Sequence, residues 1–119
     1  MTGKNAEEQP IDFHRLSLTL GVEDKVVLVS FLDLFLEEFP KLSADLKSAL
    51  ETRDPKATHH AAHAAKGAAA NAAASALTSL LKFIQDNAHQ ENWVKLELVF
   101  DEISQEHERI IKFRKALTS

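Results

Sequence analysis

Apolar residues return at three- and four-residue steps through much of this chain, which is the spacing of one face of an α-helix. The strongest such pattern covers residues 23–52. Pro40 lies inside this run, where it removes one backbone hydrogen bond and bends a helix. The pattern stays in phase across Pro40, so the sequence predicts one bent helix rather than two helices. The apolar positions that carry the pattern are Val27, Phe31, Leu34, Phe35, Leu42, Leu46 and Leu50.

Three further segments have the same amphipathic character. Residues 11–20 form a short one, and Gly21 is suited to end it. Residues 75–88 form another, and residues 92–117 form a long one for which Asn92 is the expected N-cap. Together with an alanine-rich helix, these segments predict an all-α fold, an antiparallel up-and-down four-helix bundle with an additional short N-terminal helix.

The expected domain organisation is a tail followed by one domain. Residues 1–10 are polar and end at a proline, so they are predicted to be a disordered N-terminal tail. Residues 11–119 are predicted to form a single helical-bundle domain, because 119 residues supply one hydrophobic core and not two.

Composition excludes several classes of protein. A net charge of −4 and the lack of a dense basic run argue against nucleic acid as a partner. No apolar run is long enough to cross a bilayer, and the polar start does not resemble a signal peptide, so a cytoplasmic protein without a membrane partner is expected. The absence of cysteine excludes disulfides and thiolate metal sites. No exposed apolar stripe suggests a dimer, so a monomer is expected.

An alanine-rich stretch, residues 54–75, carries the candidate chemistry. Asp54 can cap the first turn of a helix and Pro55 suits the first helical position, while alanine is the best helix former. One side of this helix is predicted to be a narrow packing seam of Thr58, Ala61, Ala65, Ala68 and Ala72. The other side carries most of the residues that interrupt the alanine run, with His63 near the middle: His59, His60, His63, Lys66, Gly67 and Asn71.

The surroundings of His63 favour a phosphoryl group on its ring. Gly67 lies one turn after His63, and glycine inside a helix costs about 1 kcal/mol relative to alanine. The missing side chain leaves the imidazole open to a bulky partner. Lys66 lies three residues after His63 and supplies a positive charge to an anion held there.

At these residues the chain resembles the histidine-containing phosphotransfer (HPt) domain of two-component phosphorelays. The family pattern H-x-x-K-G reads His63-Ala-Ala-Lys66-Gly67 here. The family's Asn-Leu-Gly-Ala run keeps Asn71, but Ala72 and Ala73 replace Leu and Gly, which leaves the end of this helix open.

The resemblance implies that His63 accepts a phosphoryl group from an aspartyl phosphate on a receiver domain and passes it to another receiver. Lys66 would stabilise the phosphate, and Gly67 would make space for docking. The implied partners are response-regulator receiver domains and a hybrid sensor histidine kinase. The implied Mg²⁺ belongs to the receiver, and no cofactor of the chain's own is expected. Docking is expected to involve His59, His60, Ala64, Ala70 and Asn71. For His59 and His60, the sequence leaves a second interpretation open, that of solvated surface residues without a role.

Two other functions remain open at this point. A non-transferring adaptor could bind a receiver or a kinase, although it would not require the His-x-x-Lys-Gly spacing. A metal ion could be held by His59 and His63, which have the i, i+4 spacing of a helical zinc pair, but no carboxylate accompanies them and Lys66 would repel the ion. No metal site is therefore assigned. The lack of a glycine-rich phosphate loop argues against a kinase activity of its own.

Overall fold

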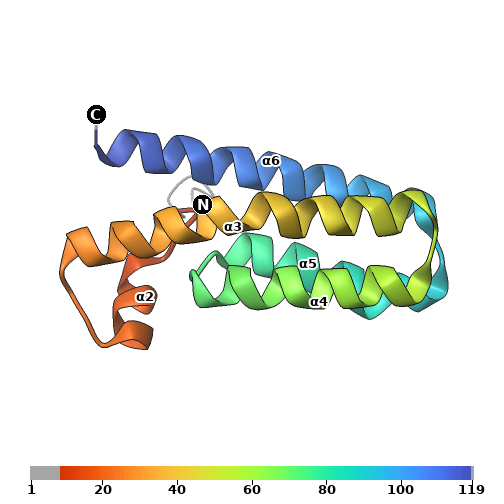
Figure 1. Ribbon diagram of the computed structural model, residues 1–119, viewed down its shortest axis with the longest axis horizontal. Coiled ribbons are helices and arrows are strands. Elements are labelled where there is room, and N and C mark those ends of the chain that lie inside the picture. The colour runs from red at the N-terminus through yellow and green to blue at the C-terminus, as the bar shows by residue number, and fades with distance from the viewer. Residues whose placement is uncertain (1–8, 119) are drawn as a thin grey trace, which may run out of the picture.

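The computed structural model describes residues 9–118, and helices make up most of this part of the chain (Figure 1). A short 3₁₀ turn, Ala88–Gln90, follows the fourth of the five α-helices that residues 9–118 contain. The five helices are α2 (Phe13–Leu20), α3 (Lys25–Glu51), α4 (Pro55–Asn71), α5 (Ser75–Asn87) and α6 (Trp93–Leu117).

Helices α3 to α6 run alternately up and down, and each connection is short (Figure 1). Helix α3 packs against both α4 and α6, while α5 packs against α4 and α6. Helices α3 and α6 are longer than α4 and α5, and they extend beyond them at the end of the bundle where α2 lies (Figure 1). The predicted four-helix bundle with an additional short N-terminal helix is confirmed.

Capping residues predicted from the sequence end α2 and begin α6. The Asp12 carboxylate accepts a hydrogen bond from the Arg15 amide at 3.0 Å, and Gly21 ends α2 with a φ of 73°. Asn92 accepts from the Lys95 amide at 3.2 Å and starts α6, as predicted. Helix α3 passes through Pro40 without interruption, which confirms one helix there and not two.

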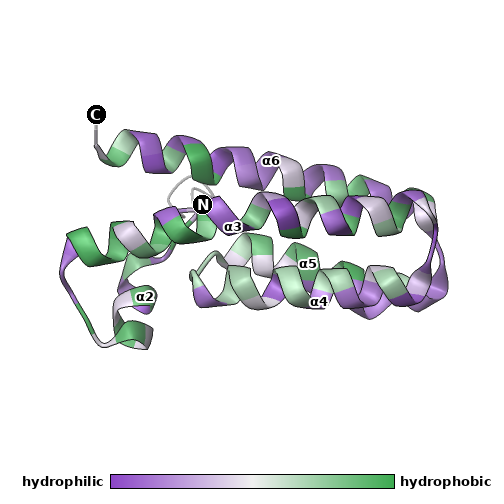
Figure 2. Cartoon of the chain, viewed as in Figure 1, coloured by the Kyte–Doolittle hydropathy of each residue, from purple (hydrophilic) through white to green (hydrophobic). Residues whose placement is uncertain are grey.

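The core runs along the length of the bundle. Figure 2 shows hydrophobic and hydrophilic residues alternating along the helices, as amphipathic helices require. The rings of His107 in α6 and Phe39 in α3 pack in a T-shaped arrangement, with the ring centres 4.9 Å apart. Burial lowers the pKa of His107, and the nearby Glu108 carboxylate offsets part of that effect. The largest fully buried side chains include Phe39, Leu32, Leu46, Leu77, Leu81, Ile84, Leu96, Ile103 and Ile110.

Two contacts join helices toward the end of the bundle where α2 lies. The Arg114 guanidinium donates two hydrogen bonds to the Asp33 carboxylate, at 2.5 and 3.0 Å. These bonds lower the pKa of Asp33. Phe13 of α2 packs on Phe113 of α6, with ring centres 5.7 Å apart. Helix α2 therefore closes this end of the bundle.

The segment before α2 is attached to the bundle. Pro10 is buried, and the Asp12 amide donates a hydrogen bond to the Ala73 carbonyl at 3.0 Å. Residues 1–8 of the predicted N-terminal tail lie outside the described residues.

Candidate functional site

Helix α4 begins as its sequence predicts. The Asp54 carboxylate accepts a hydrogen bond from the Ala57 amide at 3.0 Å, and Pro55 occupies the first helical position. The helix ends at Asn71, so the break falls where Ala72 and Ala73 stand in place of the Leu-Gly pair of the family that the chain resembles. Ala73 has a φ of 57°, a left-handed conformation that an alanine adopts at a cost.

The buried side of α4 differs in part from the predicted seam. Ala61 and Ala68 are only partly buried, although Thr58, Ala65 and Ala72 are buried as expected. Helix α4 packs against both α3 and α5. The buried residues of α4 are therefore those that both helices cover, and they lie closer to α5 than the predicted seam does. The fully covered residues are Thr58, Ala62, Ala65, Ala69 and Ala72.

The opposite side of α4 is open, and it carries every residue predicted for the site. Lys66 is half-buried, while the others are exposed. The ring of His63 makes no hydrogen bond or ion pair with any other residue in the part of the chain that the structure describes. The exposed members of this group are His59, His60, His63, Ala64, Gly67, Ala70 and Asn71.

No contact within the described fold requires a glycine at position 67. A methyl group built on its backbone would meet no atom within 4 Å, and the residue is not in a left-handed conformation. An alanine would fit at this position and would favour the helix. The glycine therefore leaves the surface beside His63 without a side chain, and no packing contact depends on it.

His59 is fixed to the neighbouring helix. Its Nδ1 lies 2.9 Å from the Gln85 carbonyl oxygen of α5, and because a carbonyl only accepts, the proton lies on Nδ1. His60 packs its ring edge-on against His59, with the ring centres 5.6 Å apart. This bond links α4 to α5 one turn before His63.

Helix α5 adds charged residues that the sequence analysis did not select. The Lys82 ammonium donates a hydrogen bond to the Asp86 carboxylate at 2.5 Å. That bond is the main cause of the lowered pKa of Asp86, to which the fields of Lys66 and His59 add. The i, i+4 spacing of Lys82 and Asp86 predicts an ion pair from the sequence. The position of this ion pair beside α4 depends on helix packing, which the spacing does not give.

On its other edge, α4 borders an apolar groove with α3. The groove has a volume of about 110 Å³, and Leu34 on its wall is 48% exposed. Of the residues predicted for docking, Asn71 contributes to it. The lining residues are Phe31, Leu34, Phe35, Glu38, Ala68, Asn71 and Ala72.

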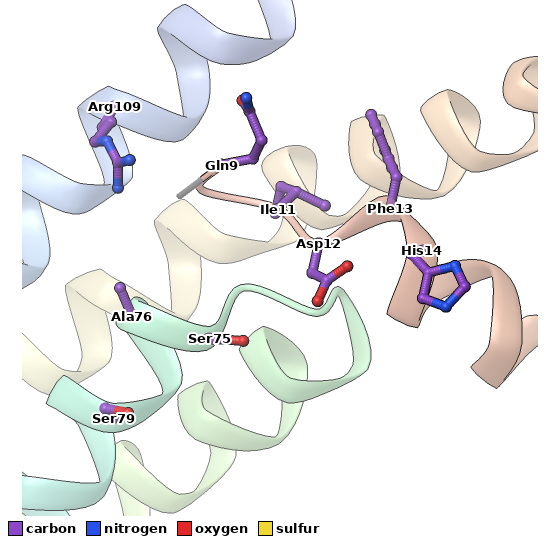
Figure 3. A pocket seen from close by; sticks show the side chains of 9 residues that line it. All are labelled: Gln9, Ile11, Asp12, Phe13, His14, Ser75, Ala76, Ser79 and Arg109. Atoms are coloured by element: carbon purple, nitrogen blue, oxygen red, sulfur yellow. The ribbon is translucent and has the colours of Figure 1, made fainter. Parts of the chain in front are cut away.

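A larger cavity, of about 610 Å³, lies between the start of α2, the start of α5 and Arg109 of α6 (Figure 3). None of the residues predicted for the site lines it. The residues around it are Gln9, Ile11, Asp12, Phe13, His14, Ser75, Ala76, Ser79 and Arg109.

Within residues 9–118, no three or more histidine, cysteine, aspartate or glutamate side chains gather in a way that could hold a metal ion. Thus His59 and His63 do not form such a group with a third side chain of these types in this part of the chain. Among the described helices, none combines the length and the apolar character needed to span a membrane.

The bundle and the exposed histidine on its alanine-rich helix together define a class, the helical phosphotransfer domains. The Hpt domain model matches residues 30–112, which is well over half of the chain. The chain therefore belongs to the Hpt domain family, whose members are phosphotransfer proteins of phosphorelays and interact with receiver domains and kinases.

A solved structure supports the fold. The chain is similar to the crystal structure of histidine-containing phosphotransfer protein B (HptB) from Pseudomonas aeruginosa PAO1, with a TM-score of 0.76 and 23% sequence identity. The match covers 90% of this chain and 93% of that one. A comparison with curated proteins found no match.

Proposed function

We propose that this chain accepts a phosphoryl group on His63 from an aspartyl phosphate of one receiver domain and passes it to the aspartate of another. The observation that carries the proposal is the exposed, unpartnered ring of His63 beside Gly67, a glycine that no packing contact of the described fold requires. A phosphoacceptor must be reachable by a whole receiver domain, and this surface is open.

The transfer needs one free ring nitrogen. By family analogy Nε2 of His63 uses its lone pair to form the phosphorus–nitrogen bond, while the bond from phosphorus to the aspartyl oxygen breaks and the carboxylate leaves with that electron pair. Lys66, on the same side of α4, stabilises the phosphoryl oxygens. The Mg²⁺ belongs to the receiver, and this chain supplies no cofactor.

Docking uses the face around His63. His59, His60, Ala64, Ala70 and Asn71 are all exposed there, and small side chains let a partner approach closely. The α3 groove next to Asn71 extends this face with apolar surface at Leu34. The partners are receiver domains of response regulators and of a hybrid sensor kinase, and the chain acts as a cytoplasmic monomer.

The test is phosphoryl transfer from charged receivers, with Mg²⁺, to the wild-type chain and to His63→Gln. Acid-labile label is expected on the wild type alone, with unchanged helicity and melting in the variant because the position is exposed. Label retained by His63→Gln would disprove the assignment. Stable binding of a receiver without any labelling of the wild type would identify an adaptor instead.

A further inference from the structure

The face of α4 that carries His63 lies between α3 and α5, and part of it is turned toward α5. At about 100° per residue, His59, His63, Lys66 and Ala70 form one row along α4. The bond between His59 and the Gln85 carbonyl places this row on the side of α5. Ala70 also borders a small cleft with Ser75, Thr78 and Ser79 of α5, which places the other end of the row beside α5 as well. The residues of α5 that border this row are therefore neighbours of His63.

The register identifies which residue of α5 lies opposite His63. The two helices are antiparallel, so one turn forward from His59 along α4 corresponds to one turn back from Gln85 along α5 (Figure 1). That step leads from His59 to His63 on one helix and from Gln85 to Leu81 and Lys82 on the other. Leu81 is buried in the core, which leaves Lys82 as the exposed residue at this level.

Lys82 is held next to the site by Asp86. Its ammonium donates to the Asp86 carboxylate at 2.5 Å, and both side chains are half or more exposed. Asp86 also lies within the electrostatic field of Lys66 and His59, which independently places this pair beside the α4 row. An ion pair so exposed is weak in water, so a stronger anion can draw the lysine away.

We propose that Lys82 is a second cationic group for the phosphoryl on His63, and that Asp86 holds it in place while the histidine is free. This inference rests on the proposed function. The phosphoryl carries more negative charge than a carboxylate, so Lys82 turns from Asp86 to the phosphoryl oxygens once the phosphorus–nitrogen bond has formed. Lys66 and Lys82 then contact the phosphoryl from the two helices that flank it.

The test compares Lys82→Gln with Asp86→Asn. If the pair were merely structural, each variant would break the same ion pair and both would move a measured quantity the same way. The proposal requires opposite directions. Lys82→Gln removes a favourable charge, and it is expected to shift the phosphoryl equilibrium about fivefold toward the receiver. Asp86→Asn removes a repulsive charge and frees the lysine, so it is expected to shift the equilibrium toward His63.

A second readout needs no receiver. The chain is phosphorylated with phosphoramidate, and the phosphorus resonance that is missing in His63→Gln is titrated by NMR. A nearby ammonium favours the dianion, so Lys82→Gln is expected to raise the pH midpoint of this resonance by about 0.5, and Asp86→Asn to lower it. Lys112→Gln is the matched control, because it removes the same charge from an exposed position on α6 and is expected to change neither readout.

The two readouts separate this inference from the proposed function. Shifts of equal sign in the two variants, or no shift beyond that of Lys112→Gln, would overturn the role of Lys82 even if receivers label His63. Opposite shifts of the phosphorus resonance in a chain that receivers bind stably without labelling would support Lys82 and disprove the phosphorelay function.

Discussion

Replacing Gly67 with alanine is expected to stabilise the protein. Gly67 lies in the interior of α4, three turns after the helix begins and one turn before it ends. A methyl group there meets no atom within 4 Å, so it causes no clash and gains no packing. The remaining effect is helix propensity, which favours alanine by about 1 kcal/mol. Gly67→Ala should therefore raise the free energy of unfolding by about 1 kcal/mol.

Urea and thermal unfolding followed by circular dichroism measure this change. For a chain of this size, about 1 kcal/mol corresponds to a rise in Tm of about 4 °C. Ala64→Gly is the matched control, because Ala64 is exposed on the same helix, and it should lower stability by a similar amount. A Gly67→Ala variant no more stable than the wild type, with a normal response of Ala64→Gly, would refute the reasoning and show that Gly67 has a role within the fold.

The same position separates stability from function. Gly67→Gln adds a long side chain that also favours a helix, so the isolated chain should remain at least as stable as the wild type. If the low surface beside His63 admits the receiver, this variant should transfer phosphoryl more slowly. An unchanged transfer rate would show that the glycine does not clear space for docking.

Two further predictions concern the bundle. Ala65→Leu should lower the free energy of unfolding by about 1–3 kcal/mol in urea melts, because Ala65 is fully buried where α4 packs; Ala64→Leu, on the exposed side, should change it little, and equal effects would contradict the observed helix orientation. Because the pKa of His107 is lowered in the folded chain, the unfolded chain binds a proton at this residue more readily as the pH falls. The free energy of unfolding should therefore be highest above about pH 6.5 and decrease below it. His107→Gln should flatten that fall, measured between about pH 7.5 and pH 5, and an unchanged slope would assign it to other histidines.

Much of the fold could be predicted because its signals are local. Helix α3 was recognised through Pro40 because the apolar period continues on both sides of it, and Asn92 and Gly21 carry capping preferences in their own side chains or in their lack of one. The alanine seam of α4 was partly wrong for a related reason. A helical wheel gives the side opposite the histidines, but which alanines are covered depends on the positions of both α3 and α5, and those positions are set by the rest of the core.

The end of α4 shows where a local signal can be overridden. The family glycine at position 73 would accept a left-handed backbone freely, and alanine does so at roughly 1–2 kcal/mol. The chain nevertheless turns there, with a φ of 57°, because Ala72, Ala73 and Ala74 are all buried and the Ala74 amide donates to the Ala69 carbonyl at 3.0 Å. Small side chains at this turn let α5 return tightly along α4.

The packing of α5 along α4 also explains why only part of the candidate site could be predicted from the sequence. His63, Lys66 and Gly67 share one helix, so their spacing alone places them together. Lys82 lies on a different helix from His63, so its distance from His63 depends on how α4 and α5 are aligned. That alignment depends on which residues of each helix are buried, and the bond between His59 and Gln85 shows it. A residue contributed by a neighbouring helix is therefore the part of such a site that only packing reveals, and the opposite charges of Lys82 and Asp86 make its contribution measurable.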